Sequence, residues 1–583
     1  MQYLRGSVGL AFPKLVAPLV TLVVLVLAVA CGAAATATPA PQATTAPAPV
    51  SGATTTPAPK PAATATPAGP VVNPGKLTIM VSDWAGERFD PIFGARRPGG
   101  LHYGRIVHAY LLSDNEKRDM LPGIASQWSL SADGKTWTYI IRKGVKFHNG
   151  AELTPEDVSW SLNHMFAPAS TEYFGLVATP EARLVEKIEQ VGADQVVIKT
   201  TTPITTFDST LSEASDKWYP IMPKRAKLFD ADLELAYDKS PIAAGPMKLV
   251  KHTPAALMAF ERFDDFYYQP KNGFKEDKRY QFRSLDLLLV PEEATRVAAV
   301  RSGEADIVPA SLTTRKQVEA GGGRLIFGQE GVYVDAKFMG CWETKYPCSK
   351  KEVRQALDYA LDKNQIRDKL YGGTDVFQTK GWMVFTPSTV GYTTALDPWP
   401  FDPNKARQLL ADAGYPKGQG FGKLIVNTFP SSSMPLQVEA AEFAADSWRR
   451  ELGLDVEVKV GDSLAIAKSW RAGELNGQFL WRDNEARRDA TAIMRSSHGD
   501  LKSLTRISED PVLLKLVEQT TETVDAAQRA RTTQDTALKL REATYQLGIG
   551  YVNIPWGVGP RVVAWQPYPL APFPAALHTV VLK

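Results

Sequence analysis

Hydrophobic and polar positions follow two different periods along this chain, and each period predicts one kind of element. In the first half of the chain most of the predicted elements are strands. Leu77–Val81 is a short apolar run typical of a strand. Trp128–Leu130 and Thr136–Ile141 flank a turn at Ala132-Asp-Gly134, which predicts a β-hairpin over residues 129–145. Further strands are expected at residues 247–250, 257–261 and 285–290.

A helix is predicted shortly after this hairpin. Thr154 suits the N-cap and Pro155 the first helical position, and two acids follow in the first turn, where they complement the helix dipole. The spacing of the apolar side chains puts Val158, Leu162 and Met165 on one face. That face is expected to pack against the core.

Beyond Gly331 the apolar positions recur with the helical period. Helices are predicted over residues 351–361, 404–413 and 438–452, and the run Asp455–Val460 predicts a strand. Gly414 is expected to cap the second of these helices. Helices that alternate with strands in this way indicate an α/β domain.

The N-terminus carries a different pattern, a single uninterrupted apolar run. Met1–Lys14 has only positive side-chain charge, and Leu15–Ala30 is uncharged and almost wholly aliphatic. The run ends on small residues before Cys31, so residues 1–31 are predicted to be a lipoprotein signal peptide with Cys31 as the lipidation site. At 16 residues the run is shorter than the roughly 20 that a membrane-spanning helix needs. An ordinary signal peptide, in which the cysteine is incidental, would have the same apolar run.

Residues 32–75 consist mainly of Ala, Thr and Pro. Such a segment has too little apolar bulk to fold, so a disordered tether is predicted between the membrane and the folded body. The whole chain has 583 residues, which leaves too many for one hydrophobic core and indicates two or three domains. Its formal net charge of +3 gives no reason to expect nucleic acid as a partner.

Two more cysteines, Cys341 and Cys348, lie close together in the sequence. In the oxidising compartment that the signal peptide implies, they are expected to form a local structural disulfide. A metal site is disfavoured because the spacing is not that of a zinc knuckle and no histidine lies nearby. No metal and no cofactor are therefore expected.

Several motifs of this chain match one known family. The longest runs from Leu121 to Leu162 and contains Arg142-Lys-Gly-Val-Lys-Phe-His-Asn-Gly150 and the helix start Thr154-Pro-Glu-Asp-Val158. Shorter motifs are Phe89-Asp-Pro91, Ala244-Gly-Pro-Met-Lys-Leu249, Ser302-Gly-Glu-Ala-Asp306, Val353-Arg-Gln-Ala-Leu-Asp-Tyr-Ala-Leu-Asp362 and Phe401-Asp-Pro-Asn-Lys-Ala-Arg-Gln-Leu-Leu410. With these motifs the chain resembles the family 5 solute-binding proteins of ABC transporters, the oligopeptide, dipeptide and nickel receptor family, from about Lys76 to its C-terminus.

The resemblance implies a two-lobed, periplasmic-binding-protein-like α/β fold of type II, cluster C, with an additional outer domain. Domain I is expected to comprise residues 76–112, 236–330 and 553–583. The outer domain II would then comprise residues 113–235. Domain III, the second ligand-binding lobe, would comprise residues 331–552.

The implied function is an extracytoplasmic, lipid-anchored and monomeric receptor, not an enzyme. It would bind peptides or oligopeptides and deliver them to the permease subunits of an ABC importer, whose ATPase is a partner subunit. The sequence has no Gly-x-x-x-x-Gly-Lys-Ser/Thr motif of its own, which agrees with that division of labour. A receptor for a sugar, an opine or a metal chelate is the alternative within the family. An extracytoplasmic hydrolase and a sensory or chaperone-like binding protein are the rivals from other classes.

The family's ligand segment is poorly matched. Peptide receptors of this kind place an aspartate in a Trp-x-Ala-Asp segment to receive the ligand's ammonium group, and the corresponding stretch here runs from Phe479 to Asp489. Trp481 is present, and either Asp483 could receive an amine or the arginines Arg482, Arg487 and Arg488 could pair with an anion. A solvated loop with internally paired charges is the third interpretation. The residues expected to meet the ligand are Trp481, Arg482, Asp483 and Asp489, with the aromatic candidates Trp84, Tyr333, Trp382 and Trp556.

Overall fold

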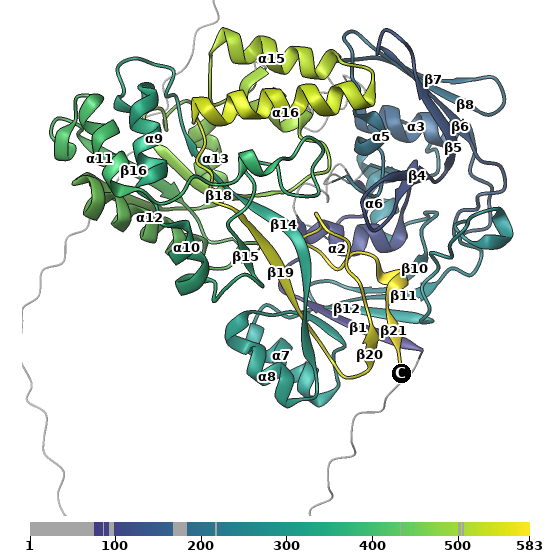
Figure 1. The fold of residues 1–583 in the computed structure, drawn as a ribbon. Helices are drawn as coiled ribbons and strands as arrows, with labels where there is room; N and C mark the ends of the chain where they lie inside the picture. Colours follow the sequence, from purple (N-terminus) through teal and green to yellow (C-terminus); the bar gives the residue numbers. More distant parts are fainter. Residues whose placement is uncertain are drawn as a thin grey trace, which may run out of the picture. The chain divides into compact units, whose positions relative to one another are not determined.

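One long sheet runs through the protein in a computed structural model, which describes residues 75–84, 87–91, 98–166, 184–215, 219–431, 433–499, 503 and 506–583. Its strands follow the order β10-β11-β12-β1-β13-β19-β14-β18-β16-β17, with β15 beside β19 (Figure 1). The strand bounds in that order are Met247–Thr253, Leu257–Arg262, Ser284–Leu289, Lys76–Val81, Ile307–Pro309, Tyr551–Val558, Arg324–Phe338, Phe479–Glu485, Lys423–Thr428 and Asp455–Val460, and β15 is Phe377–Gln378.

The neighbours in this sheet come from distant parts of the sequence. Strand β1 pairs in parallel with both β12 and β13, and β16 pairs in parallel with β17 and β18. Strand β14 lies between β18 and β19 and is antiparallel to both. Because β19 also pairs with β13, the two halves of the sheet are continuous through β19 and β14.

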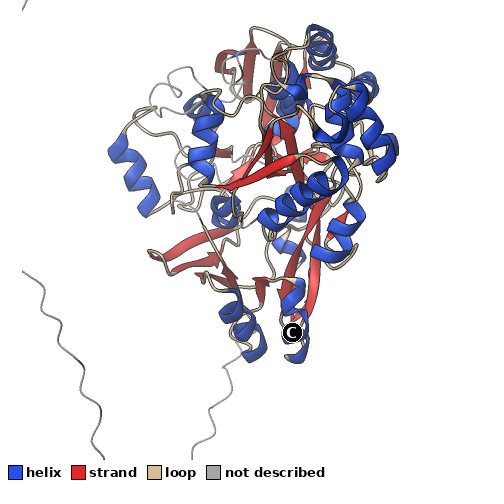
Figure 2. Cartoon of the chain, turned by 90° about the vertical axis from the view of Figure 1, so that its left-hand side faces the viewer, coloured by secondary structure: helices blue, strands red, loops and turns tan. Residues whose placement is uncertain are grey.

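Helices lie on both sides of these strands (Figure 2). The helices described in addition to α3 (below) are α2 (Pro98–Val107), α5 (Phe207–Thr210), α6 (Ala231–Lys239), α7 (Glu293–Ser302), α8 (Arg315–Ala320), α9 (Lys351–Tyr359), α10 (Lys363–Gln365), α11 (Pro403–Asp412), α12 (Gln437–Leu452), α13 (Ser463–Arg471), α14 (Thr491–Met494), α15 (Pro511–Glu522) and α16 (Ala526–Ala543). Short strands complete the chain: β2 (Ala109–Tyr110), β3 (Leu112–Asp114), β4 (Met120–Pro122), β9 (Pro220–Ile221), β20 (Val562–Ala564) and β21 (Val581–Leu582).

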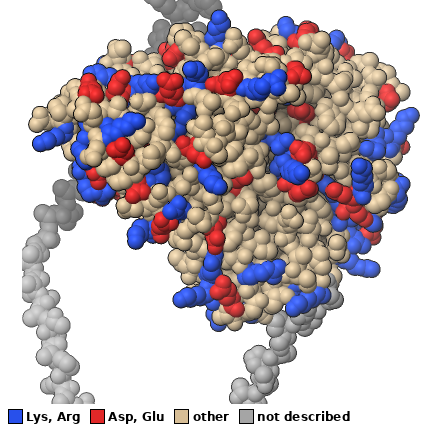
Figure 3. Space-filling model, viewed as in Figure 1, with Lys and Arg blue, Asp and Glu red and all other residues tan. Residues whose placement is uncertain are grey.

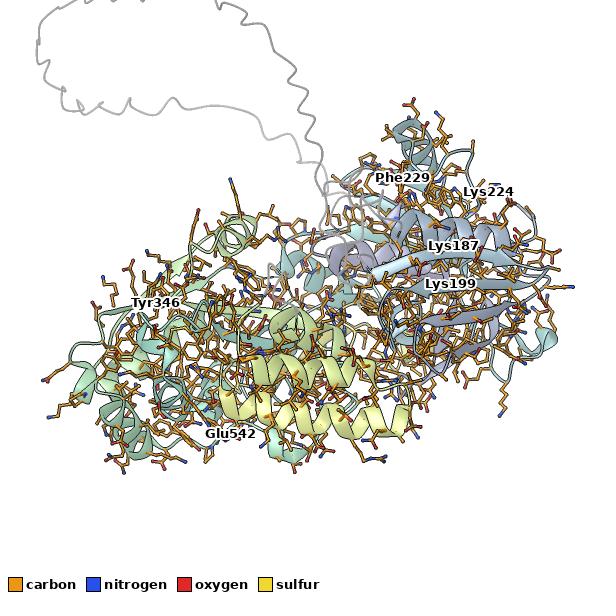
Figure 4. All side chains as sticks on the ribbon, turned by 90° about the horizontal axis from the view of Figure 1, so that it is seen from above. Lys187, Lys199, Lys224, Phe229, Tyr346 and Glu542 are labelled. Atoms are coloured by element: carbon orange, nitrogen blue, oxygen red, sulfur yellow. A yellow bond between two sulfur atoms is a disulfide. The ribbon has the colours of Figure 1, made fainter. Side chains whose placement is uncertain are left out.

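A second, four-stranded sheet has its own hydrophobic core. It has the order β5-β6-β8-β7, with bounds Ala125–Leu130, Thr136–Ile141, Gln195–Thr200 and Val185–Val191. Helix α3 (Pro155–Phe166) packs on it through Val158 and Leu162. On strands β7 and β8, Lys187 and Lys199 lie opposite each other and share Glu189 (Figure 4).

Most of the elements expected from the sequence are confirmed. The hairpin is β5–β6, with Trp128 opposite Tyr139, and the helix after it begins at Pro155 with Asp157 N–H directed at the Thr154 hydroxyl. One end differs from the expectation. Ala413, not Gly414, is the C-cap of α11, and Gly414 follows it with φ 92°, a conformation that glycine adopts without a steric penalty.

The predicted domain boundaries stay a prediction. The second core also takes in Leu111, Leu112, Ala244 and Phe266, which lie outside the expected outer domain at 113–235. The described residues all belong to a single compact unit, Ala68–Lys583. On the face drawn in Figure 3, positive and negative side chains are interspersed.

Several predictions fall outside the described part of the chain. These are the signal peptide at 1–31, the lipidation site Cys31 and the tether up to residue 74. Within the described part, no helix is long and apolar enough to cross a membrane. Cys341 and Cys348, both buried, are joined by a disulfide with a Cα–Cα distance of 5.3 Å.

Candidate functional site

The expected ligand segment forms strand β18, and its pairing with β14 fixes the direction of each side chain. Trp481 lies opposite Ala336, Arg482 opposite Asp335, and Asp483 opposite Val334. Successive side chains of a strand point to opposite faces of the sheet. Trp481 and Asp483 therefore share one face, and Arg482 lies on the other.

The face that carries Trp481 and Asp483 is the one covered by helix α12. Phe479, two positions before Trp481, packs edge-on against Trp448 of α12 with a centroid distance of 5.3 Å. Trp481 is fully buried, and its indole N–H has no hydrogen-bond partner among the described residues. The Asp483 carboxylate is half-buried and accepts a hydrogen bond from the Ser431 hydroxyl at 3.0 Å. Asp483 forms no ion pair with any described cation, so this face offers an uncompensated carboxylate beside an aromatic ring.

The opposite face is charged although it is largely buried. Asp335 and Lys337 form an ion pair of 2.8 Å, and the Arg482 Nε lies 3.6 Å from the same carboxylate. Burial lowers the pKa of Lys337, and it raises the pKa of the Tyr333 hydroxyl well above its usual value. Arg482 and Arg487 act electrostatically on Tyr333. Cationic groups therefore outnumber carboxylates around this tyrosine.

Asn484 stands where the peptide-receptor motif would have its aspartate. In Trp-x-Ala-Asp the acid is the fourth residue, and the fourth residue counted from Trp481 is Asn484, which lies opposite Tyr333. An amide carries no charge to neutralise an ammonium group. The position that holds a negative charge in the peptide-receptor motif is therefore uncharged in this chain. Asp483 is one residue earlier in the strand, so its carboxylate lies on the opposite face of the sheet from Asn484.

The segment after β18 contacts a distant hairpin. Arg488 pairs with Asp119, next to β4, at 2.6 Å and also donates to the Lys117 carbonyl at 3.1 Å. Asp489 accepts the Thr491 N–H at 2.8 Å and lies near Asp208. Burial and this neighbouring carboxylate raise the pKa of Asp208 to about 6. Asp489 therefore interacts with Thr491 and Asp208 of the protein itself.

The remaining aromatic candidates lie in the main hydrophobic core. Trp84 and Trp382 are each 1% exposed, and their indole N–H groups donate to the Glu87 carboxylate and the Gln546 carbonyl, both at 3.0 Å. Trp556 is equally buried, and its indole N–H has no partner among the described residues. The satisfied indoles of Trp84 and Trp382 fit a packing role; those of Trp481 and Trp556 can still donate.

Sequence reasoning missed the hydrogen bonds between Glu330 and Ser388, which lie where the pairing of β14 is irregular. The pairing of β14 with β19 shifts between Gly328 and Val332, and Glu330 has φ 55° there. Its carboxylate accepts the Ser388 N–H and hydroxyl, both at 2.8 Å. The signal that could have revealed it is the pair of glycines at 328 and 331, which interrupt an otherwise apolar strand pattern.

A cavity of ≈ 70 Å³ lies away from these residues, between α2 and the C-terminal segment. None of the eight side chains predicted to bind ligand lines it. Within the described ranges, no group of three or more His, Cys, Asp or Glu could hold a metal ion.

Known proteins of one family share both sequence and fold with this chain. The dipeptide-binding protein of Escherichia coli (strain K12) is 27% identical over 321 residues, 52% of this chain and 56% of that protein. The nickel-binding periplasmic protein of the same organism is 24% identical over 501 residues, 78% and 86% of the two chains. The alignment with the first relative thus spans little more than half of its length.

The solved structure of the ABC transporter substrate-binding protein CtaP from Listeria monocytogenes has a TM-score of 0.71 and 21% identity, and the match covers 87% of this chain and 99% of that one. This likeness confirms the two-lobed α/β fold with an outer sheet. The model for "Bacterial extracellular solute-binding proteins, family 5 Middle" matches residues 119–497, more than half of the chain. The chain therefore belongs to the bacterial extracellular solute-binding proteins, family 5.

Proposed function

We propose that this chain is the extracytoplasmic receptor of an ABC importer and that it binds peptides. The observation that carries the proposal is the arrangement on β18, where the buried Trp481 indole, with an unused N–H, lies on the same face as the uncompensated Asp483 carboxylate. Arg482 lies on the opposite face. A peptide offers an ammonium group to the Asp483 carboxylate and a backbone carbonyl to the Trp481 indole N–H. A charged terminus in a closed site of low dielectric needs such a counter-charge.

The receptor works by closure, not by chemistry on its ligand. A solute stabilises the closed state only through contacts that it makes in that state and not in the open one. Aromatic side chains provide large contact area without dictating the ligand's sequence. ATP hydrolysis belongs to the partner subunits in this proposal. Incubation with a peptide mixture separates it from the hydrolase alternative, because a receptor returns every peptide intact.

A second candidate ligand is a non-peptide solute that carries a carboxylate but no ammonium group, for example an opine. Asn484 in place of the motif's aspartate favours it, as do the arginines that act on Tyr333. Guanidinium groups pair with carboxylates in two parallel hydrogen bonds, so they suit such a ligand. Sugars and metal chelates, two further solute classes expected within this family, gain no such support from these charges.

The experiment that tests both candidates begins with native mass spectrometry of the purified protein, which identifies the solute that co-purifies. Calorimetric titration of that solute then compares Asp483→Ala with Arg482→Ala. For a peptide, Asp483→Ala should weaken binding by about 2 to 5 kcal/mol, as expected when one partner of a buried charge pair is lost. For an anionic solute, Arg482→Ala should have that effect instead.

Matched controls are Asp455→Ala, on the exposed start of β17, and Arg531→Ala, on the exposed face of α16. Neither should change the affinity. If all four variants bind with the affinity of the unaltered protein, the ligand does not meet β18 and the site assignment is wrong.

We further propose that the mature protein begins at a lipidated Cys31 and is tethered to the membrane by the following Ala/Thr/Pro segment. The order of positive, apolar and small residues before this cysteine supports the proposal. Cys31→Ser should release the protein from the membrane fraction, because one acyl-bearing residue is lost while the folded body is unchanged. A variant that stays in the membrane with its Met1 intact would indicate an uncleaved anchor.

A further inference from the structure

The cavity of ≈ 70 Å³ is built from segments that are far apart in the sequence. Helix α2, the β3–β4 hairpin, the residues before β12 and the C-terminal residues 573–578 all line it. Its charged lining side chains are Arg105, Asp114, Arg118, Glu213 and Lys278. It shares no residue with the solute site proposed above, and its role is independent of that proposal.

The charges that line the cavity do not balance. Arg118 is paired with Asp114, and Lys278 contacts Glu213 at 3.3 Å and the Ser113 hydroxyl at 2.7 Å. Within the described ranges, Arg105 donates only to backbone carbonyls, those of Glu213 and Ser215. Three cations therefore face two carboxylates, and one positive charge is left over.

At neutral pH Lys278 stays protonated and Glu213 stays ionised, so the excess positive charge of the lining remains. Although burial opposes its charge, Glu213 and Asp114 raise the pKa of Lys278. Lys278 and the Ser113 hydroxyl likewise hold the pKa of Glu213 below its usual range despite burial. The two histidines of the lining, His102 and His578, are neutral, because burial lowers the pKa of each to about 4.

Four polar atoms of the lining have no hydrogen-bond partner among the described residues. They are the Nε atoms of Arg105 and Arg118, the Tyr110 hydroxyl and the Nδ1 of His102. Arg118 and Tyr110 are only 2% and 1% exposed. A guanidinium N–H can only donate, and leaving it buried without an acceptor is costly. A buried water needs roughly 10 to 15 Å³ of such a cavity, so there is room for a group of several atoms.

We propose that this cavity binds a small monovalent anion, of the size of chloride or formate. Such an anion accepts from the two guanidinium N–H groups and from the Tyr110 hydroxyl, and it neutralises the excess positive charge. The C-terminal segment forms one wall, with Phe573 stacked on the Arg105 guanidinium at 4.4 Å. Anion binding therefore links α2 to the β3–β4 hairpin, and the C-terminal segment packs on α2 through Phe573 and Arg105.

The test uses the full-length folded protein and bromide as the probe. Crystals grown with sodium bromide and without chloride should show one anomalous peak within the cavity, and formate should displace it. Thermal unfolding should occur at a higher temperature in sodium chloride or formate than in sodium gluconate of the same ionic strength, because gluconate is too large to enter. A cavity that contains only water in the bromide crystals, or equal unfolding temperatures in all three salts, would overturn the proposal.

Two conservative variants test whether bromide binds at the proposed donors in the cavity. Arg105→Lys keeps the charge but removes the Nε donor, and Tyr110→Phe removes only the hydroxyl. Each should weaken bromide binding by about tenfold, as for the loss of one hydrogen bond to a charged group. The controls are Arg354→Lys, a buried arginine whose Nε already donates to Ala543, and Tyr139→Phe, a buried hydroxyl outside the cavity with no partner in the described part of the chain. Equal bromide affinity in Tyr110→Phe and Tyr139→Phe would contradict the assignment.

Discussion

At the scale of single residues, the direction of the side chains along β18 determines which of them share a face of the sheet. Trp481 and Asp483 face helix α12, while Arg482 faces Asp335 and Tyr333. In the proposed site, a solute that contacts the Trp481 indole N–H therefore meets the Asp483 carboxylate on the same side of the sheet. The Arg482 guanidinium lies on the other face, on the side of Tyr333. The alanine variants at 482 and 483 consequently probe two different surfaces.

Gly550 permits the close approach of two strands. It precedes β19 with φ 137°, and a Cβ atom there would lie 2.1 Å from the Gln378 carbonyl oxygen of β15. Gly550→Ala should lower the free energy of unfolding by about 3 kcal/mol or more, because backbone atoms must separate as well as change conformation. Denaturant unfolding followed by circular dichroism measures the change.

Gly373 is the matched control for this prediction. It has φ 124°, and nothing lies within 4 Å of a Cβ built there. Gly373→Ala should therefore lower the free energy of unfolding by about 1 to 2 kcal/mol, because only the unfavourable backbone conformation of alanine contributes. Equal losses in the two variants would show that conformation alone, and not the contact with Gln378, constrains Gly550.

At the scale of elements, β14 and β19 join the two halves of the sheet. Strand β14 extends over 15 residues, and its pairing with β19 shifts where Glu330 is held by Ser388 and Asn553. A bulge of this kind bends a strand and interrupts its ladder of hydrogen bonds. If the protein closes on its solute as proposed, the position between Gly328 and Val332 is where we expect the backbone to bend.

The ion pair between Arg488 and Asp119 links the segment after β18 to the β3–β4 hairpin. If closure brings these elements together, Arg488→Ala and Asp119→Ala should each weaken solute binding about 1.4-fold to fivefold, which matches the 0.2 to 1 kcal/mol of an exposed pair. The double variant should be no weaker than either single one. Calorimetric titration of the three variants measures this.

The pair of Arg450 with Asp446 is the control. It lies within α12, is also exposed, and spans one helical turn. Its removal should leave the affinity unchanged. Additive losses from Arg488→Ala and Asp119→Ala would contradict a direct coupling between the two residues.

At the scale of the whole molecule, buried neutral histidines make stability depend on pH. Burial lowers the pKa of five of the seven histidines, to about 4 for His102, His148 and His578 and to about 3 for His108 and His498. In the unfolded chain each would titrate near 6.5. Below that pH the unfolded chain binds more protons than the folded one, so the stability that these groups provide is lost as the pH falls from about 6.5 toward 4.

The expected loss is about 1.5 kcal/mol per histidine between pH 6.5 and pH 5. Urea unfolding at pH 7 and at pH 5 should show a large decrease in the free energy of unfolding. His498→Gln should make the decrease in the free energy of unfolding smaller by the contribution of one histidine. The substitution disturbs little else, since the Nδ1 of His498 contacts only the Ser508 hydroxyl among the described residues. A variant with the same pH dependence as the unaltered protein would show that His498 is protonated without unfolding.

The sequence by itself determined the local elements of this protein. The β5–β6 hairpin, the capped start of α3 and the amphipathic helices α9, α11 and α12 all follow from periods and caps that involve neighbours within a few residues. The family followed from ordered motifs, and the Cys341–Cys348 pairing from two cysteines close together in the chain.

Only the tertiary structure decided which distant residues meet. It placed β19 between β13 and β14, brought Asp335 and Lys337 beside Arg482, and enclosed Arg105 and Arg118 in one cavity with Lys278. It also buried Trp84 and Trp382 in the core, where protein acceptors satisfy their indole N–H groups. The reason is physical: a strand's period fixes the face on which a side chain lies, whereas the partner on that face depends on strand pairing across hundreds of residues.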